Sequence, residues 1–241
     1  MRSFVWVFML AASFFYSCKK KKDAPAPAKI NTDTVSTSTS SPFVGYFITN
    51  NSVGYTSQMT GNEMVSARFF SQPLSALYGS NDVQVGAISL NGSNLSYKGV
   101  GGYVLQIATS SDPGTDTWYV TGDAAGLIPT FSFANKNPFP SCTNMNVLPD
   151  TISKSKGCNF TLTNISNMNS GTLRFGSITT FTLTQGSNHI VITPAMLSAA
   201  PTGTFGSIDF QLQYGVTVTR SGKNFRFIKE TELIKPIIIV P

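Results

Sequence analysis

Short runs of alternating apolar and polar residues occupy the chain beyond residue 42. Alternation places the apolar side chains on one face of a β-strand, so each run predicts a strand. The first runs are FVGYFIT, MVSARFF, VQVGAISL, YVLQIA, TWYVTG and PTFSFA, and similar runs follow residue 150. Between them lie GSND, NGSN, GVGG and SDPGTD, which carry the residues that favour turns. Only 12% of the residues are charged, and the pattern predicts an all-β fold.

Two local patterns predict individual elements. Asn91-Gly92 favours a tight hairpin because both residues tolerate positive φ. The strand residues that flank this turn are then Ile88, Leu90, Leu95 and Tyr97. Further along, TLTQGSNHIVIT predicts a second hairpin. Thr193 followed by Pro194 predicts the start of a short helix that ends at Pro201.

A break at residues 135–150, which contains three prolines, divides the strand pattern into two parts. We expect a small β-sandwich domain at 42–138 and a second one at 139–241, and a single continuous sandwich is the alternative. About seven strands in the last 100 residues or so resemble the immunoglobulin-like class of β-sandwich. This stretch does not carry the Cys and Trp signature of antibody domains.

The start of the chain has the layout of a signal peptide. Arg2 gives a positive start, residues 4–16 are apolar apart from Ser13, and the small Ser17 precedes Cys18. As a helix, the apolar stretch would rise about 20 Å, which is short of the roughly 30 Å hydrocarbon layer of a membrane. A stable transmembrane helix is therefore not expected.

The sequence SFFYSCKKKKD around Cys18 resembles the lipoprotein signal of Bacteroidetes. The resemblance implies a signal peptide at 1–17, cleavage before Cys18, and lipid on the Cys18 thiol. The following tether at 18–41 has almost no apolar content, so we expect it to be disordered. The resemblance also implies an outer-membrane anchor at the cell surface, with a periplasm-facing position as the alternative. An uncleaved signal anchor and ordinary cleavage at another site are the other two interpretations of this leader.

Two tripeptides resemble the O-glycosylation site of the same bacteria. They are Asp33-Thr34-Val35 in the tether and Asp150-Thr151-Ile152 later in the chain. The resemblance implies glycans on Thr34 and Thr151, whereas plain turn residues would explain the same tripeptides.

The net charge of +6 does not indicate a nucleic-acid-binding protein. Residues 1–41 hold six basic and two acidic residues, and the remaining 200 hold 11 basic and nine acidic ones. The excess is therefore +4 in the leader and tether but only +2 in the folded part. The folded part carries no basic field that would bind phosphate groups, so we expect no nucleic-acid partner.

Cys142 and Cys158 are the two cysteines that remain once Cys18 is assigned to lipid. In an oxidising envelope compartment such a pair favours a disulfide, which would stabilise the fold by about 3 kcal/mol. Two thiols and a distant His189 are too few ligands for a metal site, and we expect neither metal nor cofactor.

The sequence contains no clear catalytic constellation. His189 is the only histidine, and no G-x-S-x-G motif accompanies it. Asp112 and Asp116 in SDPGTD indicate turn residues or a weak cation loop. We therefore expect a non-catalytic protein, and a hydrolytic enzyme is the least favoured interpretation.

Two non-catalytic functions fit a lipid-anchored β protein. The first is contact with a partner protein of the envelope, which we favour. The second is glycan binding, for which four aromatic residues would form an exposed platform: Tyr46, Tyr103, Trp118 and Tyr119. Core packing would account for the same residues, since each lies in an alternating run.

Overall fold

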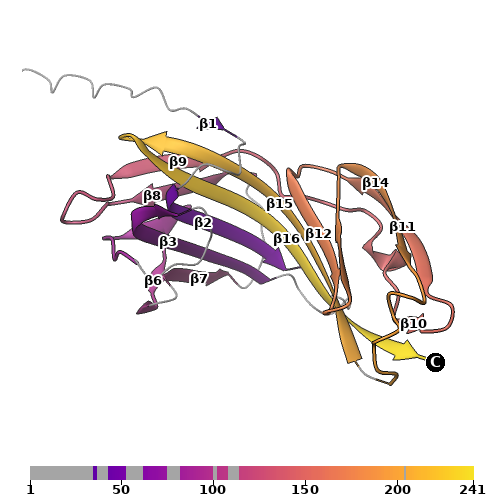
Figure 1. Ribbon diagram of the computed structural model, residues 1–241. Helices are drawn as coiled ribbons and strands as arrows, with labels where there is room; N and C mark the ends of the chain where they lie inside the picture. The colour runs from indigo at the N-terminus through magenta and orange to yellow at the C-terminus, as the bar shows by residue number, and fades with distance from the viewer. Residues whose placement is uncertain are drawn as a thin grey trace, which may run out of the picture. The chain divides into compact units, whose positions relative to one another are not determined.

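The computed structural model describes residues 35–36, 43–52, 62–74, 82–99, 102–107, 114–203 and 205–241. These residues form an all-β fold with several sheets, as the alternation predicts (Figure 1). No helix within these ranges is long and apolar enough to cross a membrane. The predicted signal peptide, Cys18, most of the tether and Thr34 lie outside the described residues.

One large sheet of ten strands forms the first layer. Its main path, in spatial order, is β13 (Thr179–Thr182), β12 (Ser170–Phe175), β15 (Phe205–Arg220), β16 (Lys223–Val240), β2 (Phe43–Ser52), β3 (Asn62–Leu74), β7 (Tyr103–Ile107) and β6 (Ser96–Tyr97). Two short strands lie off this path: β1 (Val35–Ser36) pairs with β15, and β10 (Thr151–Ser153) pairs with β16. Neighbouring strands are antiparallel except at β16–β2 and β10–β16.

Two smaller sheets pack against different parts of the large sheet. One has four strands in the order β5 (Ser93–Asn94), β4 (Ile88–Leu90), β8 (Asp116–Val120) and β9 (Phe131–Asn135). The other pairs β11 (Cys158–Ile165) with β14 (Gly186–Ile192). A short 3-10 turn, η2 (Met145–Val147), precedes β10. Each pair of layers encloses one hydrophobic core, which is the arrangement of a β-sandwich.

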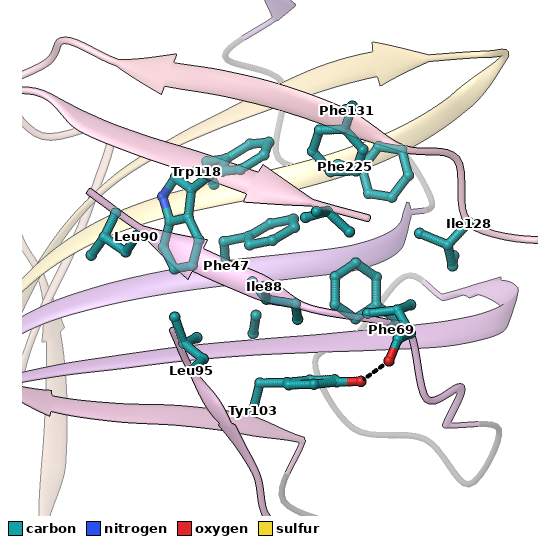
Figure 2. Close-up of a cluster of buried hydrophobic side chains, with 14 of the residues drawn as sticks. Phe47, Phe69, Ile88, Leu90, Leu95, Tyr103, Trp118, Ile128, Phe131 and Phe225 are labelled. Atoms are coloured by element: carbon teal, nitrogen blue, oxygen red, sulfur yellow. Dashed lines mark hydrogen bonds between the residues drawn. The ribbon is translucent and has the colours of Figure 1, made fainter. Parts of the chain in front are cut away.

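The first core is rich in aromatic rings (Figure 2). Phe47 of β2 stacks on Phe227 of β16 with ring centroids 4.3 Å apart, and the Trp118 ring lies 4.9 Å from Phe47. The Tyr103 hydroxyl donates a hydrogen bond to the Val85 carbonyl oxygen. The second core is mainly aliphatic, with Leu162, Leu173, Ile190, Phe210 and Leu233 among its members.

The long hairpin of β15 and β16 takes part in both cores. Figure 1 shows these two strands side by side, extending from β2 to β12. On β15, Ile208, Phe210 and Leu212 belong to the second core, whereas Val216 and Val218 belong to the first. The predicted domain boundary at residue 138 precedes this hairpin in the chain. Residues after the boundary therefore help to complete the first core, which also contains residues from before it. Independent folding of 42–138 and 139–241, and an immunoglobulin-like strand order, stay predictions.

The predicted hairpin at Asn91-Gly92 is confirmed. Asn91 has φ 50° and Gly92 has φ 83°, and Leu90 pairs with Ser93 across the turn. Ile88 and Leu90 are residues of β4 and are buried in the first core. Leu95 is buried there as well but lies between β5 and β6, and Tyr97 belongs to β6 of the large sheet, so these two residues are not part of the hairpin as predicted. The turn forms because Asn and Gly adopt positive φ at low cost.

The predicted hairpin within TLTQGSNHIVIT is wrong. β13 pairs with β12 in the large sheet, whereas β14 pairs with β11 in the small one. The chain therefore crosses between layers after Thr182, and Leu183 is buried in the second core where it crosses. Alternation on both sides of a polar turn is the same for a hairpin and for a crossover, so the pattern could not separate them.

The predicted helix at residues 193–201 is wrong as well. The Leu197 amide donates to the Pro194 carbonyl (3.1 Å), and the Ala200 amide donates to the Leu197 carbonyl (3.0 Å). These bonds span three residues, so the segment is a series of tight turns rather than an α-helix. The Thr193 hydroxyl does accept a bond from the Met196 amide (3.4 Å), as an N-cap would. A segment bounded by two prolines is too short to propagate a helix.

Candidate functional site

The four aromatic residues of the predicted glycan platform do not share one exposed surface. Trp118 and Tyr103 are buried in the first core, and Tyr46 is half-buried and stacks on Phe70 with centroids 6.0 Å apart. Only Tyr119 is largely exposed, at 45%. Trp118 and Tyr119 are neighbours on β8, so their side chains point to opposite faces of the sheet. The platform prediction is therefore corrected, because core packing accounts for two of its four members.

Replacing Trp118 by Ala is expected to lower the free energy of unfolding by about 3–5 kcal/mol, because it removes a large buried ring from the first core. The neighbouring Tyr119→Ala variant is the matched control, and its effect should be about 0.5 kcal/mol or less. Chemical denaturation of the two variants measures both values. Equal effects would contradict the opposite placement of the two rings.

Within the described part of the chain, the side chain that contacts the His189 ring through a hydrogen bond is a hydroxyl group and not the carboxylate that a catalytic triad requires. His189 is an exposed residue of β14 and lies opposite Thr161 of β11, with its Nδ1 3.0 Å from the Thr161 hydroxyl oxygen. Among the described residues, no group of three or more His, Cys, Asp or Glu side chains could hold a metal ion. The geometry around His189 therefore indicates a surface residue of a sheet.

Asp116 lies in the first core and not in an exposed turn or cation loop, so that prediction is wrong for this residue. Asp112 lies outside the described residues. Asp116 is 1% exposed and Lys229 is fully buried. Asp116 Oδ1 lies 3.6 Å from Lys229 Nζ, and the Thr49 hydroxyl donates to Asp116 Oδ2 at 2.9 Å. We call these three residues the buried Asp–Lys site.

The segment after β9 closes over the buried Asp–Lys site. The Phe139 ring centroid lies 4.8 Å from Lys229 Nζ, which is within the range of a cation–π contact. Two residues along β16, the Thr231 hydroxyl donates to the Pro140 carbonyl at 2.6 Å. The connection between the two cores is thus fixed to β16 where the strand passes from one core to the other.

A second polar cluster lies on the opposite face of β16 and is centred on Glu230, which is buried. Glu230 accepts hydrogen bonds from Asn50 (2.6 Å), Gln211 (2.9 Å) and Gln213 (2.5 Å). Asn50 Nδ2 also donates to Glu232 at 2.9 Å. We call these five residues the Glu230 cluster. Side-chain amides donate hydrogen bonds to both carboxyl oxygens of Glu230. Glu230 and Glu232 therefore belong to a structural hydrogen-bond network and not to an open acid–base site.

Burial raises the pKa of Glu230, the amides of Gln213 and Gln211 oppose that rise, and the charge of Glu232 adds to it. The folded protein therefore holds a proton on Glu230 at pH values where the unfolded chain has released it. Because the native state binds more protons in this window, the free energy of unfolding falls as pH rises from the ordinary glutamate pKa through the raised one.

Replacing Glu230 by Gln is expected to remove this part of the pH dependence, so the stability of the variant rises relative to wild type as pH rises through the window. Glu232→Gln should remove a smaller part, since it takes away only one contribution to the raised pKa. Denaturant titrations at a series of pH values measure both differences. Parallel curves for wild type and Glu230→Gln would contradict a raised pKa at this residue.

An apolar cavity of about 690 Å³ lies beside the second core. Phe175, Ile178, Met196, Ala200, Ile237 and Ile239 contribute to its lining. No acidic, basic, Cys or His side chain is among the described residues that line it, and Ser177 and Ser207 supply its hydroxyl groups. The cavity offers apolar contact but brings together no acid–base pair.

The predicted disulfide between Cys142 and Cys158 is contradicted, because both residues are free thiols. The Cys142 sulfur lies 3.6 Å from the Thr163 carbonyl oxygen, and Thr163 follows Cys158 by five residues on β11. Five residues of extended strand span roughly 16 Å. Because Cys142 lies beside Thr163, the strand separates it from Cys158 by more than the roughly 4–7 Å that a disulfide allows between Cα atoms. Burial raises the pKa of both thiols, which lowers their reactivity.

Thr151, the candidate glycosylation site within the described chain, is an exposed residue of β10. Its neighbour Ile152 is buried in the second core. Asp150, which precedes it, pairs with Lys235 at 2.9 Å. Glycosylation of Thr151 stays a prediction, and Thr34 lies outside the described residues.

Sequence reasoning missed Lys229 and Glu230 as residues of polar sites. The signal was present in NFRFIKETELIK, where Lys229 occupies the same face of the strand as Phe227 and Leu233. A lysine at a core position of an alternating strand predicts a buried partner, because an isolated buried charge is costly. The partner, Asp116, lies far away in the chain and could not be named from the pattern.

No protein-family model matches this chain, and no curated protein matches it either. Function must therefore be inferred from the chain's own residues.

Proposed function

We propose that this chain is a lipoprotein of the bacterial outer membrane, and that its β fold serves protein contacts and not catalysis. One observation carries the proposal: an apolar stretch at residues 4–16 ends next to Cys18, and four lysines follow at once. The thiol of Cys18 is the nucleophile to which lipid would be attached. Several acyl chains would hold the protein firmly, whereas one chain gives only marginal binding.

An exposed apolar row on β16 supports a role in protein contact. Alternation along this strand directs Leu233 and Ile237 into the second core, so Ile234 and Ile238 face the other way. Ile234 is 58% exposed and Ile238 is 38% exposed. Exposed apolar side chains that lie together on a sheet favour contact with another protein. The proposed partner is therefore a protein of the envelope that packs against this face of β16.

Protease treatment of intact cells tests the cell-surface position. We expect the folded part of the chain to be digested while a periplasmic marker protein stays intact. Complete protection of the chain in intact cells, followed by digestion once the outer membrane is opened, would contradict surface display. That result would favour the periplasm-facing position of the same anchored protein.

A further inference from the structure

The buried Asp–Lys site brings an amine and a carboxyl group together between the two layers of the first core. Lys229 belongs to β16 of the large sheet, and Asp116 belongs to β8 of the four-stranded sheet. Their side chains are 0% and 1% exposed, and Nζ lies 3.6 Å from Oδ1. We propose that these two side chains condense to an isopeptide bond, which cross-links the two layers of the first sandwich covalently.

The position of the amine favours this reaction. Lys229 Nζ makes no hydrogen bond within the described part of the chain, so an ammonium group there would lack acceptors for its protons. Amide formation needs a neutral amine and a neutral acid, and transfer of one proton from the amine to the nearby carboxylate supplies both reactants.

The surroundings of the carboxyl group favour attack at its carbon. The Asp116 Cγ atom is one bond from Oδ1, and reacting atoms in near-attack geometries lie about 3–3.5 Å apart. The Thr49 hydroxyl donates to Oδ2, where negative charge develops during attack. Thr49 is also the direct neighbour of Lys229 in the pairing of β2 with β16. The Phe139 ring lies on the amine and helps to keep water away.

The bond changes balance without any other reactant. The Lys229 nitrogen lone pair attacks Asp116 Cγ, and a C–N bond forms. The C–Oδ1 bond then breaks, and Oδ1 leaves as water with the acid proton and one amine proton. The product amide keeps Oδ2 as its carbonyl oxygen and one proton on nitrogen. No atom is oxidised or reduced.

The chain contains a matched pair that should not react. Lys235 is also buried, and its Nζ lies 2.9 Å from Asp150 Oδ1. The Asp150 side chain, however, is 72% exposed, so water stabilises its charge. Lys235 Nζ also donates to the Leu148 carbonyl oxygen. The amine and the carboxyl group are closer in this pair than in the pair of Lys229 and Asp116. The comparison therefore tests whether the reaction depends on burial of the acid or only on the distance between the two groups.

Mass spectrometry of the full-length protein tests the proposal. The purified protein is kept folded for several days, denatured, and digested with trypsin. We expect most of the material to yield one species in which residues 99–136 are joined to residues 227–241, one water lighter than the two peptides together. Trypsin should not cut after a modified Lys229 or between Lys235 and Pro236. No peptide should join Lys235 to Asp150.

Two variants provide the controls. Lys229→Met removes the amine and should abolish the joined species. Thr49→Val should lower its yield at a given time without changing the circular dichroism of the fold. Recovery of residues 227–229 and 99–136 only as separate peptides from the folded wild-type protein would overturn the proposal and leave an ion pair alone. That outcome does not depend on whether either variant folds.

Discussion

Replacing Lys229 by Met is expected to lower the free energy of unfolding by about 3–5 kcal/mol, because it removes the amine that Asp116 faces and leaves a buried carboxylate without a counter-charge in the variant. Asp116 would keep the hydrogen bond from Thr49, but it would lose the amine at 3.6 Å. A buried charge without a counter-charge is among the most costly defects in a core. Denaturant-induced unfolding at neutral pH measures the loss.

The double variant Lys229→Met with Asp116→Leu should recover most of this loss, because it also removes the carboxylate that the single variant leaves buried, and well-packed apolar side chains fill such a site at little cost. Lys235→Met is the control: it leaves Asp150 hydrated, so its cost should be limited to the lost bond at the Leu148 carbonyl, about 1–3 kcal/mol. A double variant as unstable as Lys229→Met alone would contradict the charge-based explanation.

Replacing Cys18 by Ser is expected to abolish labelling of the protein by radioactive or alkyne-bearing fatty acid, and to release it from the membrane fraction. Serine lacks the thiol to which lipid would be attached, and without acyl chains the proposed membrane anchor is lost. Metabolic labelling followed by fractionation of cells measures both effects.

Cys158→Ser is the matched control for this experiment, since it removes a thiol from the folded part of the chain. It should leave labelling and membrane retention unchanged. Undiminished labelling of Cys18→Ser would exclude Cys18 as the lipidated residue. Full membrane retention of an unlabelled Cys18→Ser protein would instead favour an uncleaved signal anchor.

Local alternation was sufficient to predict the all-β fold and the Asn91-Gly92 turn. Each of those features depends on residues that are close in sequence. The pairing partner of a strand depends on distant residues, which is why β13 and β14 look like one hairpin in the sequence but lie in different sheets. The sharing of β15 and β16 between two cores is likewise invisible in the local pattern, because both halves of each strand alternate in the same way.

The candidate site was predicted less well for a related reason. Alternation assigns Trp118 and Tyr119 to opposite faces of β8, but it does not say which face is covered. The covered face carries Asp116, Trp118 and Val120, so the tryptophan is core and the aspartate is a buried partner. Cys142 and Cys158 are close in sequence, yet the extended course of β11 keeps them apart.

The long hairpin has a consequence for mutations. Because β16 supplies Phe227 to the first core and Leu233 to the second, a defect between them affects both. Lys229 and Thr231 lie in that interval, and the segment around Phe139 and Pro140 is attached to them. This stretch of β16 therefore links the two cores, as β15 does beside it.

Mass spectrometry of the N-terminal peptide from membrane-extracted protein tests the lipoprotein assignment most directly. The account predicts that the mature chain begins at Cys18 and that the mass of this residue includes covalently bound fatty acyl groups. A chain that begins at Met1 with an unmodified Cys18 would contradict it.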